Sequence, residues 1–160
     1  MQKQTRQFFW FFLLGSYLFL STSLIGSAWA AENRFKTLED GTVKDQKSGL
    51  IWASRDNGSS IIWSEAVTYC ENYSEGGHKD WRMPSADELA TLYGNRRKVK
   101  DQDYEETIDV VTKSIKITSP WVWTSRRTAK NKAIAYGFNY GTSRRMHRGS
   151  GGTRRALPVR

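Results

Sequence analysis

Apolar and polar positions alternate along the chain with the period of strands in some segments and of helices in others. Residues 42–45 and 50–53 resemble two short strands, and the Gln46–Gly49 segment between them is a turn, so a hairpin is predicted. Residues 121–125 and 133–140 alternate with period two, which predicts two further strands. Residues 155–160 are expected to close the chain as a short strand.

Two later segments have helical spacing. Ala66, Val67, Cys70 and Tyr73 recur three or four residues apart, which predicts a helix that Ser64 caps and that ends near Tyr73. Ser85 followed by Glu88 is a capping box, and it predicts a second helix before Gly94. The apolar residues expected to face inward from this second helix are Leu89, Leu92 and Tyr93.

The segment from residue 95 to 114 is mostly polar, with few and irregular apolar positions. It predicts an exposed insertion of low order. Two helices among several short strands make an α+β domain the expected fold class.

The N-terminal residues have the pattern of an export signal. Lys3 and Arg6 precede an uncharged run from residue 8 to 31, and Ala28-Trp29-Ala30 offers small residues where a signal peptidase cleaves. We therefore expect residues 1–30 to be a signal peptide and residues 31–160 to form a single domain that is periplasmic or secreted and has no membrane span. The alternative is an uncleaved anchor, because a run of this length can cross a bilayer.

Charge is distributed unevenly along the chain. The 160 residues carry 25 Lys and Arg against 16 Asp and Glu, a formal net charge of +9. From residue 110 to the C-terminus there are 12 basic residues and no acidic one. Because these basic residues alternate with strand-like aromatic segments, a folded frame holds them together despite their mutual repulsion, which favours an anionic partner.

The basic residues of the C-terminal third are the candidate binding site. Arg suits sulfate, phosphate and carboxylate, because its planar fork donates two parallel hydrogen bonds. If the strands form a simple meander, the two basic connections lie at opposite ends of a strand, roughly 26 Å apart. If instead the Gly-rich segment 141–153 folds back, the two groups merge. The candidate ligand-binding residues are Arg126, Arg127, Lys130, Lys132, Arg144, Arg145, Arg148, Arg154 and Arg155.

Several short motifs follow one another in a specific order: Asp40-Gly41-Thr42-Val43, Gly49-Leu50-Ile51-Trp52, Trp63-Ser64-Glu65-Ala66 with Tyr69-Cys70, Asp80-Trp81-Arg82-Met83-Pro84, Trp121-Val122-Trp123-Thr124-Ser125 and Pro158-Val159-Arg160. This succession resembles one bacterial family, the Lcl C-terminal domain family, which is found at the end of a collagen-like adhesin. The resemblance implies a C-type-lectin-like fold of two helices packed on short antiparallel strands, export, and non-catalytic adhesion through sulfated glycosaminoglycans. Many relatives carry a second Cys near the closing strand, where this chain has Ala156-Leu157-Pro158.

Residues capable of catalysis or metal binding are scarce. One Cys and two His cannot build a four-ligand zinc site or an iron–sulfur cluster, and Cys70 lies on an apolar helical stripe that predicts a core position. We expect no catalytic residues, no metal ligands and no cofactor. Five tryptophans fall in predicted strands or at helix starts, and at least four of them are expected in the core: Trp52, Trp63, Trp81, Trp121 and Trp123.

Three functions remain open from the sequence. The leading one is an exported module that binds an anionic polymer: a sulfated or acidic polysaccharide, lipopolysaccharide phosphate or extracellular DNA, with nucleic acid only a non-specific polyanion. The second is a structural subunit that docks on an acidic cell-surface or periplasmic protein assembly and buries its aromatic sheet and Cys70 there. The weakest is an enzyme, because no set of acid, base and metal ligands converges.

Overall fold

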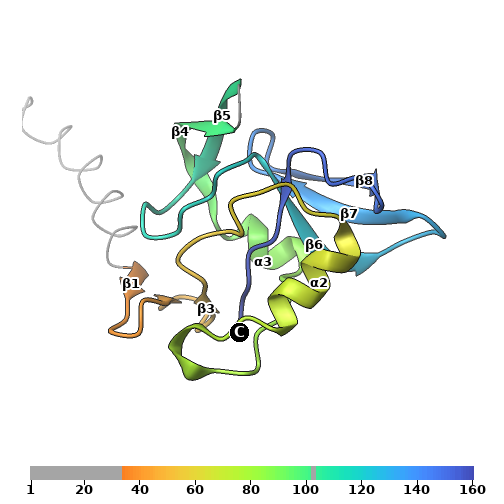
Figure 1. Cartoon of the computed structure of the whole chain (residues 1–160). Helices are drawn as coiled ribbons and strands as arrows, with labels where there is room; N and C mark the ends of the chain where they lie inside the picture. Colours follow the sequence, from red (N-terminus) through yellow and green to blue (C-terminus); the bar gives the residue numbers. More distant parts are fainter. Residues whose placement is uncertain (1–33, 102–103) are drawn as a thin grey trace, which may run out of the picture.

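The computed structural model describes residues 34–101 and 104–160, which contain nine strands and two α-helices (Figure 1). The predicted signal peptide lies outside the described residues. The helices are α2 (Trp63–Glu71) and α3 (Ala86–Ala90), and a short 3₁₀ turn, η1, covers Glu75–Gly77. The strands are β1 (Phe35–Thr37), β2 (Val43–Asp45), β3 (Ile51–Trp52), β4 (Tyr93–Asp101), β5 (Tyr104–Val110), β6 (Trp121–Arg127), β7 (Lys132–Gly137), β8 (Thr142–His147) and β9 (Arg154–Arg155).

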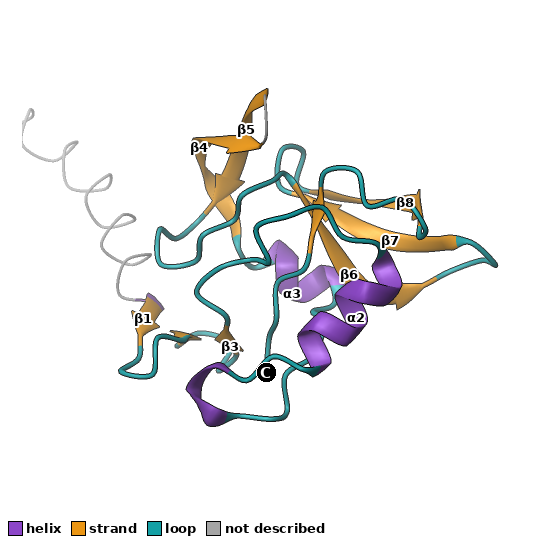
Figure 2. Cartoon of the chain, in the orientation of Figure 1, coloured by secondary structure: helices purple, strands orange, loops and turns teal. Residues whose placement is uncertain are grey.

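The strands form three separate sheets. One has the order β1-β2-β3, the second is the β4-β5 hairpin, and the third has the order β8-β7-β6-β9. Every pair is antiparallel except β6 and β9, which run parallel. Figure 2 shows the β4–β5 hairpin projecting from the body of the molecule, and the four-stranded sheet beside the two helices.

The two helices contribute to different cores on the two faces of the four-stranded sheet. Side chains alternate between the faces of a strand, so Ala133 and Ala135 of β7 lie on the face opposite to Tyr136. The two alanines belong to a buried cluster with Ala66 and Cys70 of α2. Tyr136 instead belongs to a larger cluster that contains two leucines of the α3 segment, Leu89 and Leu92.

The C-terminal segment ties the small N-terminal sheet to the rest of the molecule. Ile51 and Arg160 exchange two backbone hydrogen bonds of 2.9 Å, and Val159 exchanges two more of 2.9 Å with Arg82. The predicted closing strand is thus present as the two residues of β9 followed by these isolated bridges.

The expectation of an α+β, C-type-lectin-like fold is wrong. Strands predominate over helices among the described residues, and they are divided into three curled sheets, so the fold is mostly β. The two predicted helices exist, but they are short. The expectation failed because two charged segments that lack apolar alternation form strands.

The first of these segments was expected to be a poorly ordered insertion at residues 95–114. It contains β5 and all of β4 except Tyr93 and Gly94, and the two strands pair with Lys98 opposite Thr107 and Lys100 opposite Glu105. The second is β8, which we expected to be part of a long connection. Apolar alternation marks a strand with one buried face, and the exposed edge strand β8 does not need it. In β5 the alternation is limited to Ile108 and Val110, which are buried in the core, and two positions were too few to predict the strand.

Several local predictions are confirmed. β2 and β3 pair as the expected hairpin, and the Ser85 capping box is present with both of its hydrogen bonds, from Glu88 N to Ser85 Oγ (3.1 Å) and from Ser85 N to Glu88 Oε2 (2.7 Å). Ser64 does not cap the first helix, because α2 already begins at Trp63 and Ile62 occupies the cap position. Tyr93 was expected in the core but is partly exposed.

Cys70 and the tryptophans contribute to the core. Cys70 is completely buried, and this burial raises the pKa of its thiol to about 12. Trp52, Trp81 and Trp123 are buried, whereas Trp63 and Trp121 are half-buried and pack against the cluster beneath α2. Three of the five tryptophans are therefore fully in the core, and the expected number of at least four is reached only when the half-buried Trp63 and Trp121 are included. None of the described helices has the length and apolar character that a transmembrane span requires.

Candidate anion-binding surface

Six of the predicted basic residues are exposed on two neighbouring parts of the four-stranded sheet. The end of β6, the turn after it and the start of β7 carry one group, and the edge strand β8 carries the other. Arg148, which follows β8, is half-buried, and its backbone oxygen accepts a hydrogen bond from Trp63 N at 2.9 Å. We call this set the cationic edge; its residues are Arg126, Arg127, Lys130, Lys132, Arg144, Arg145 and Arg148.

The strand register brings the two groups together. β8 runs back along β7 with Lys132 opposite His147, and Arg148 N donates a hydrogen bond of 3.0 Å to Asn131 O in the β6–β7 turn. Arg144 lies opposite Ala135, three residues along β7 from Lys132, which is about 10 Å at the rise of a strand. The two groups therefore lie along one edge of the sheet, as the fold-back alternative predicted and the simple meander did not. Arg144 shares a face with Ala135, and Lys132 and Arg145 project from the opposite face of the same edge.

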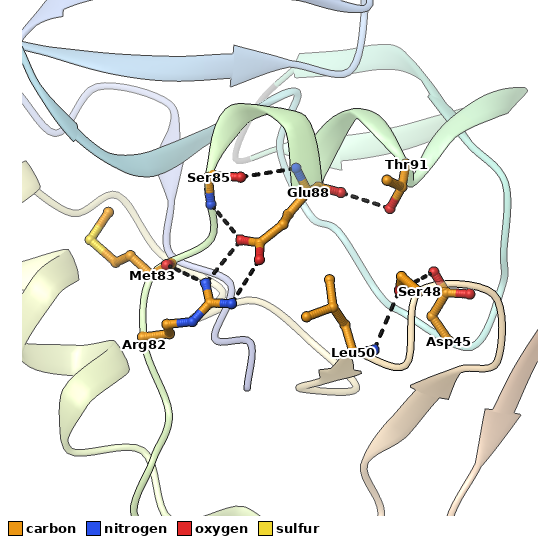
Figure 3. A network of polar contacts seen from close by, with 8 residues as sticks. All are labelled: Asp45, Ser48, Leu50, Arg82, Met83, Ser85, Glu88 and Thr91. Carbon is orange, nitrogen blue, oxygen red and sulfur yellow. Dashed lines mark hydrogen bonds and ion pairs between the residues drawn. The ribbon is translucent and has the colours of Figure 1, made fainter.

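The cationic edge has no anionic partner in the described part of the chain. None of its seven basic side chains forms an ion pair there. Arginines elsewhere do: Arg34 contacts Asp45 at 2.6 Å, Arg82 contacts Glu88 at 2.7 Å, and Arg160 contacts Asp80 at 2.8 Å. Figure 3 shows one of these pairs, in which Arg82 and the capping residue Glu88 meet in a two-point contact.

Two predicted site residues do not belong to the cationic edge. Arg155 is 2% exposed, and its Nε donates a 3.0 Å hydrogen bond to Thr118 Oγ1, so it is a core residue. Arg154 is half-buried, and its Nη1 donates to Ser150 O (2.9 Å) and Gly151 O (3.1 Å). Burial lowers the pKa of Arg154. Both residues lie in β9, which pairs with β6. The sequence-based expectation that they face solvent rested on their charge alone and is wrong.

Arg155 lies near a buried carboxylate. Asp56 accepts hydrogen bonds from Thr118 N (2.6 Å), Thr118 Oγ1 and Gly58 N, and the positive charge of Arg155 acts to lower its pKa. Burial has the larger effect and raises the pKa of Asp56. This network joins loop 54–58 to the segment before β6, so its role is structural.

Aromatic residues beside the cationic edge were not predicted to contribute to the site. Tyr140, in the β7–β8 turn, is 61% exposed, and its ring centroid lies 6.4 Å from that of the half-buried Trp121. The guanidinium carbon of Arg144 lies 5.0 Å from the Tyr140 ring centroid and 5.6 Å from that of Trp121. An aromatic residue directly before a turn glycine, as in Tyr140-Gly141, is a sequence signal that could have identified this position.

A second concave feature lies along the outer side of α2. It is an open groove of about 580 Å³ lined by polar and aromatic residues, among them Glu65, Tyr69, Tyr73 and Glu75. Tyr73 donates a hydrogen bond to Glu75, and its ring packs edge-on against Trp81. These contacts hold the groove's side chains to one another. In the part of the chain that the structure describes, no group of three or more acidic, His or Cys side chains converges on a metal-binding point.

Fold and surface together define a mostly β domain whose exposed basic residues on one sheet edge have no carboxylate partner within residues 34–101 and 104–160. The chain belongs to the Lcl C-terminal domain family, whose model matches residues 41–160. This membership suggests an adhesin-like extracellular module and does not specify a ligand. Comparison with curated proteins finds no match.

Proposed function

We propose that this protein is an exported, non-catalytic module that binds anionic polymers through the cationic edge. The observation that carries the proposal is the row of exposed Arg and Lys residues from β6 to β8, which has no carboxylate partner among the described residues. Like charges held on a rigid sheet repel one another, and a bound polyanion relieves that repulsion.

The length of the edge suits a polymer better than a small ion. The β6–β7 turn and Arg144 are separated by about 10 Å of strand, and a single sulfate or phosphate cannot contact both. A polysaccharide chain or another repeating polyanion can follow the strand and contact several basic residues in succession. Family membership, which suggests an adhesin-like extracellular module, supports this function and an extracellular or periplasmic location.

A protein partner is the second candidate, and one observation favours it. β8 is an edge strand, and no backbone hydrogen bond from another described segment reaches Ser143 or Arg145, so an acidic extended peptide could add a strand there. A partner that covers the aromatic sheet and Cys70 is not favoured, because Cys70 and Trp123 are already buried in the core cluster between α2 and the four-stranded sheet.

The test is heparin binding measured across a salt series with the exported protein. Replacing Lys132, Arg144 and Arg145 together by Ser removes three exposed charges from the cationic edge. If about three polymer charges are neutralised there, the log–log dependence of affinity on salt should become shallower by about 2–3 units through counterion release.

A matched triple variant controls for overall charge. Lys36, Lys44 and Lys47 are also exposed, lie on or just after β1 and β2, and carry the same formal charge. Their replacement by Ser should leave the salt slope nearly unchanged. Equal losses in the two triple variants would mean that net charge explains the binding without a defined surface. Absence of heparin binding by the unmodified protein would refute the polymer proposal and leave the acidic-peptide partner to be tested.

A further inference from the structure

Arg144 differs from the other basic residues of the cationic edge because aromatic rings hold its side chain. Its guanidinium carbon lies within cation–π distance of both Tyr140 (5.0 Å) and Trp121 (5.6 Å). The other six residues of the edge have no such contact in the described part of the chain.

A glycine allows this arrangement. Gly137 of β7 lies opposite Trp121 of β6, and a Cβ at Gly137 would come 2.6 Å from Cζ3 of the Trp121 ring. Any other residue at Gly137 would therefore displace the indole from the sheet. With glycine there, the ring extends across β7 towards β8, where Arg144 projects from the same face as Ala135. Gly137, Trp121 and Arg144 thus form one structural unit.

The hydrogen-bonding groups of Arg144 remain available. Arg154 also lies near an indole, 5.4 Å from the Trp123 centroid, but its guanidinium donates to two backbone oxygens and to Met146 Sδ. Arg34 lies 4.6 Å from the Phe35 centroid and is bound to Asp45. Arg144 donates no hydrogen bond and forms no ion pair within the described residues, and it is exposed.

We propose that Trp121 and Tyr140 hold Arg144 as a preorganised subsite for a tetrahedral oxyanion, namely a sulfate or phosphate ester group of the bound polymer. This inference rests on the proposed function and deepens it. An arginine packed against aromatic rings has less side-chain freedom to lose on binding, and its planar fork can then donate two parallel hydrogen bonds. The other exposed basic residues act through charge alone and contribute mainly to long-range attraction.

The experiment separates charge from geometry by exchanging arginine for lysine. Arg144→Lys and Arg145→Lys each keep the charge, and both positions are exposed on β8, so neither should impair folding. Arg144→Lys should weaken heparin binding about three- to tenfold, because the bidentate fork is lost and the aromatic contact changes. Arg145→Lys should change the affinity less than about twofold. Both variants should keep the salt slope of the unmodified protein.

Tyr140→Ser tests the aromatic contribution separately. It should lower the affinity by about two- to fivefold at an unchanged salt slope. Combined with Arg144→Lys, it should add little further loss, because the ring acts through the arginine. Thermal unfolding of each variant, expected within a few degrees of the unmodified protein, controls for folding.

The outcomes distinguish this inference from the proposed function. If Arg144→Lys and Arg145→Lys weaken heparin binding equally, the subsite is refuted, but the proposal that the cationic edge binds polyanions still holds. No heparin binding by the unmodified protein would overturn both. Repeating the series with inorganic polyphosphate identifies the source of the oxyanion: an equal effect of Arg144→Lys on both polymers indicates any tetrahedral oxyanion, and an effect on heparin alone indicates a sulfate carried on a sugar.

Discussion

Arginines in two regions of this molecule have opposite environments. Around the N-terminal sheet and α3, Arg34, Arg82 and Arg160 each contact a carboxylate at 2.6–2.8 Å. Along β6, β7 and β8, the basic residues have no such partner among the described residues. Charge in the first region contributes contacts within the fold, and one of them, between Arg160 and Asp80, joins segments that are distant in the sequence. Charge in the second region contributes nothing comparable to the fold and remains available for a ligand.

This difference shows that net charge alone is a poor guide to a binding site. Arg154 and Arg155 lie within the same basic third of the sequence as Arg144, yet one is bound to backbone oxygens and the other is buried. The informative quantity is the number of basic side chains that are exposed and unpaired on one rigid surface.

The largest expected effect is at the buried ion pair. Asp45 is fully buried, and Arg34 contacts both of its carboxylate oxygens, at 2.7 and 2.6 Å. Arg34→Met leaves this carboxylate without its cation and should lower the free energy of unfolding by about 3–5 kcal/mol, measured by urea denaturation. The matched control is Arg82→Met, whose pair with Glu88 is partly exposed and should cost about 1 kcal/mol or less. Equal costs would remove the distinction between the two pairs.

The stability of the protein at low pH should also depend on the Arg34–Asp45 ion pair. Burial acts to raise the pKa of Asp45, but hydrogen bonds from Arg34, Ser48 and Lys47 outweigh it and lower the pKa to about 2. Because this is below the unfolded value of about 3.9, the carboxylate stabilises the fold fully only above about pH 5, and about 2–3 kcal/mol in all is lost as the pH falls from about 5 to 1. Urea denaturation between pH 2 and 7 measures this loss, which should be smaller in Arg34→Met. The same pH dependence in both proteins would contradict the assignment to this pair.

The next effect concerns packing beneath the cationic edge. Cys70→Ser buries a hydroxyl in an apolar site and should cost on the order of 1–3 kcal/mol. The thiol should also resist alkylating reagents in the native state, because it is buried and its pKa is raised to about 12. Rapid labelling of the folded protein, or a dimer that disappears with reductant, would show that α2 does not protect Cys70.

The smallest effect on stability is expected at the cationic edge itself. The triple variant Lys132→Ser, Arg144→Ser, Arg145→Ser should change the free energy of unfolding by less than about 0.5 kcal/mol, since exposed unpaired charges contribute little and relief of repulsion can offset their loss. Thermal and urea denaturation of this variant measure the change. If the free energy of unfolding fell by several kcal/mol, these residues would stabilise the fold as the paired arginines do, and the two regions would not differ.

Export is a separate prediction from the sequence. Cleavage after Ala30 should leave Ala31 as the mature N-terminus, and mass spectrometry of the exported protein measures it. Retention of residues 1–30 would favour the membrane-anchor alternative.

Local sequence determined the features that depend on neighbouring residues. The capping box of α3 needs only Ser85 and Glu88, three positions apart, and the β2–β3 hairpin needs only its turn and its flanking apolar residues. The buried face of α2 follows from helical spacing, which placed Ala66 and Cys70 correctly. The motif order was also sufficient to identify the family.

Tertiary structure decided which basic residues share a surface. β8 has no apolar alternation, so only its pairing with β7 shows that it runs back to the β6–β7 turn and brings the two basic groups to one edge of the sheet. The burial of Arg155 depends on β9 joining β6 in parallel, a contact between segments more than thirty residues apart. Hydrogen bonds between distant strands set these positions, and no local pattern of residues encodes which strands will meet.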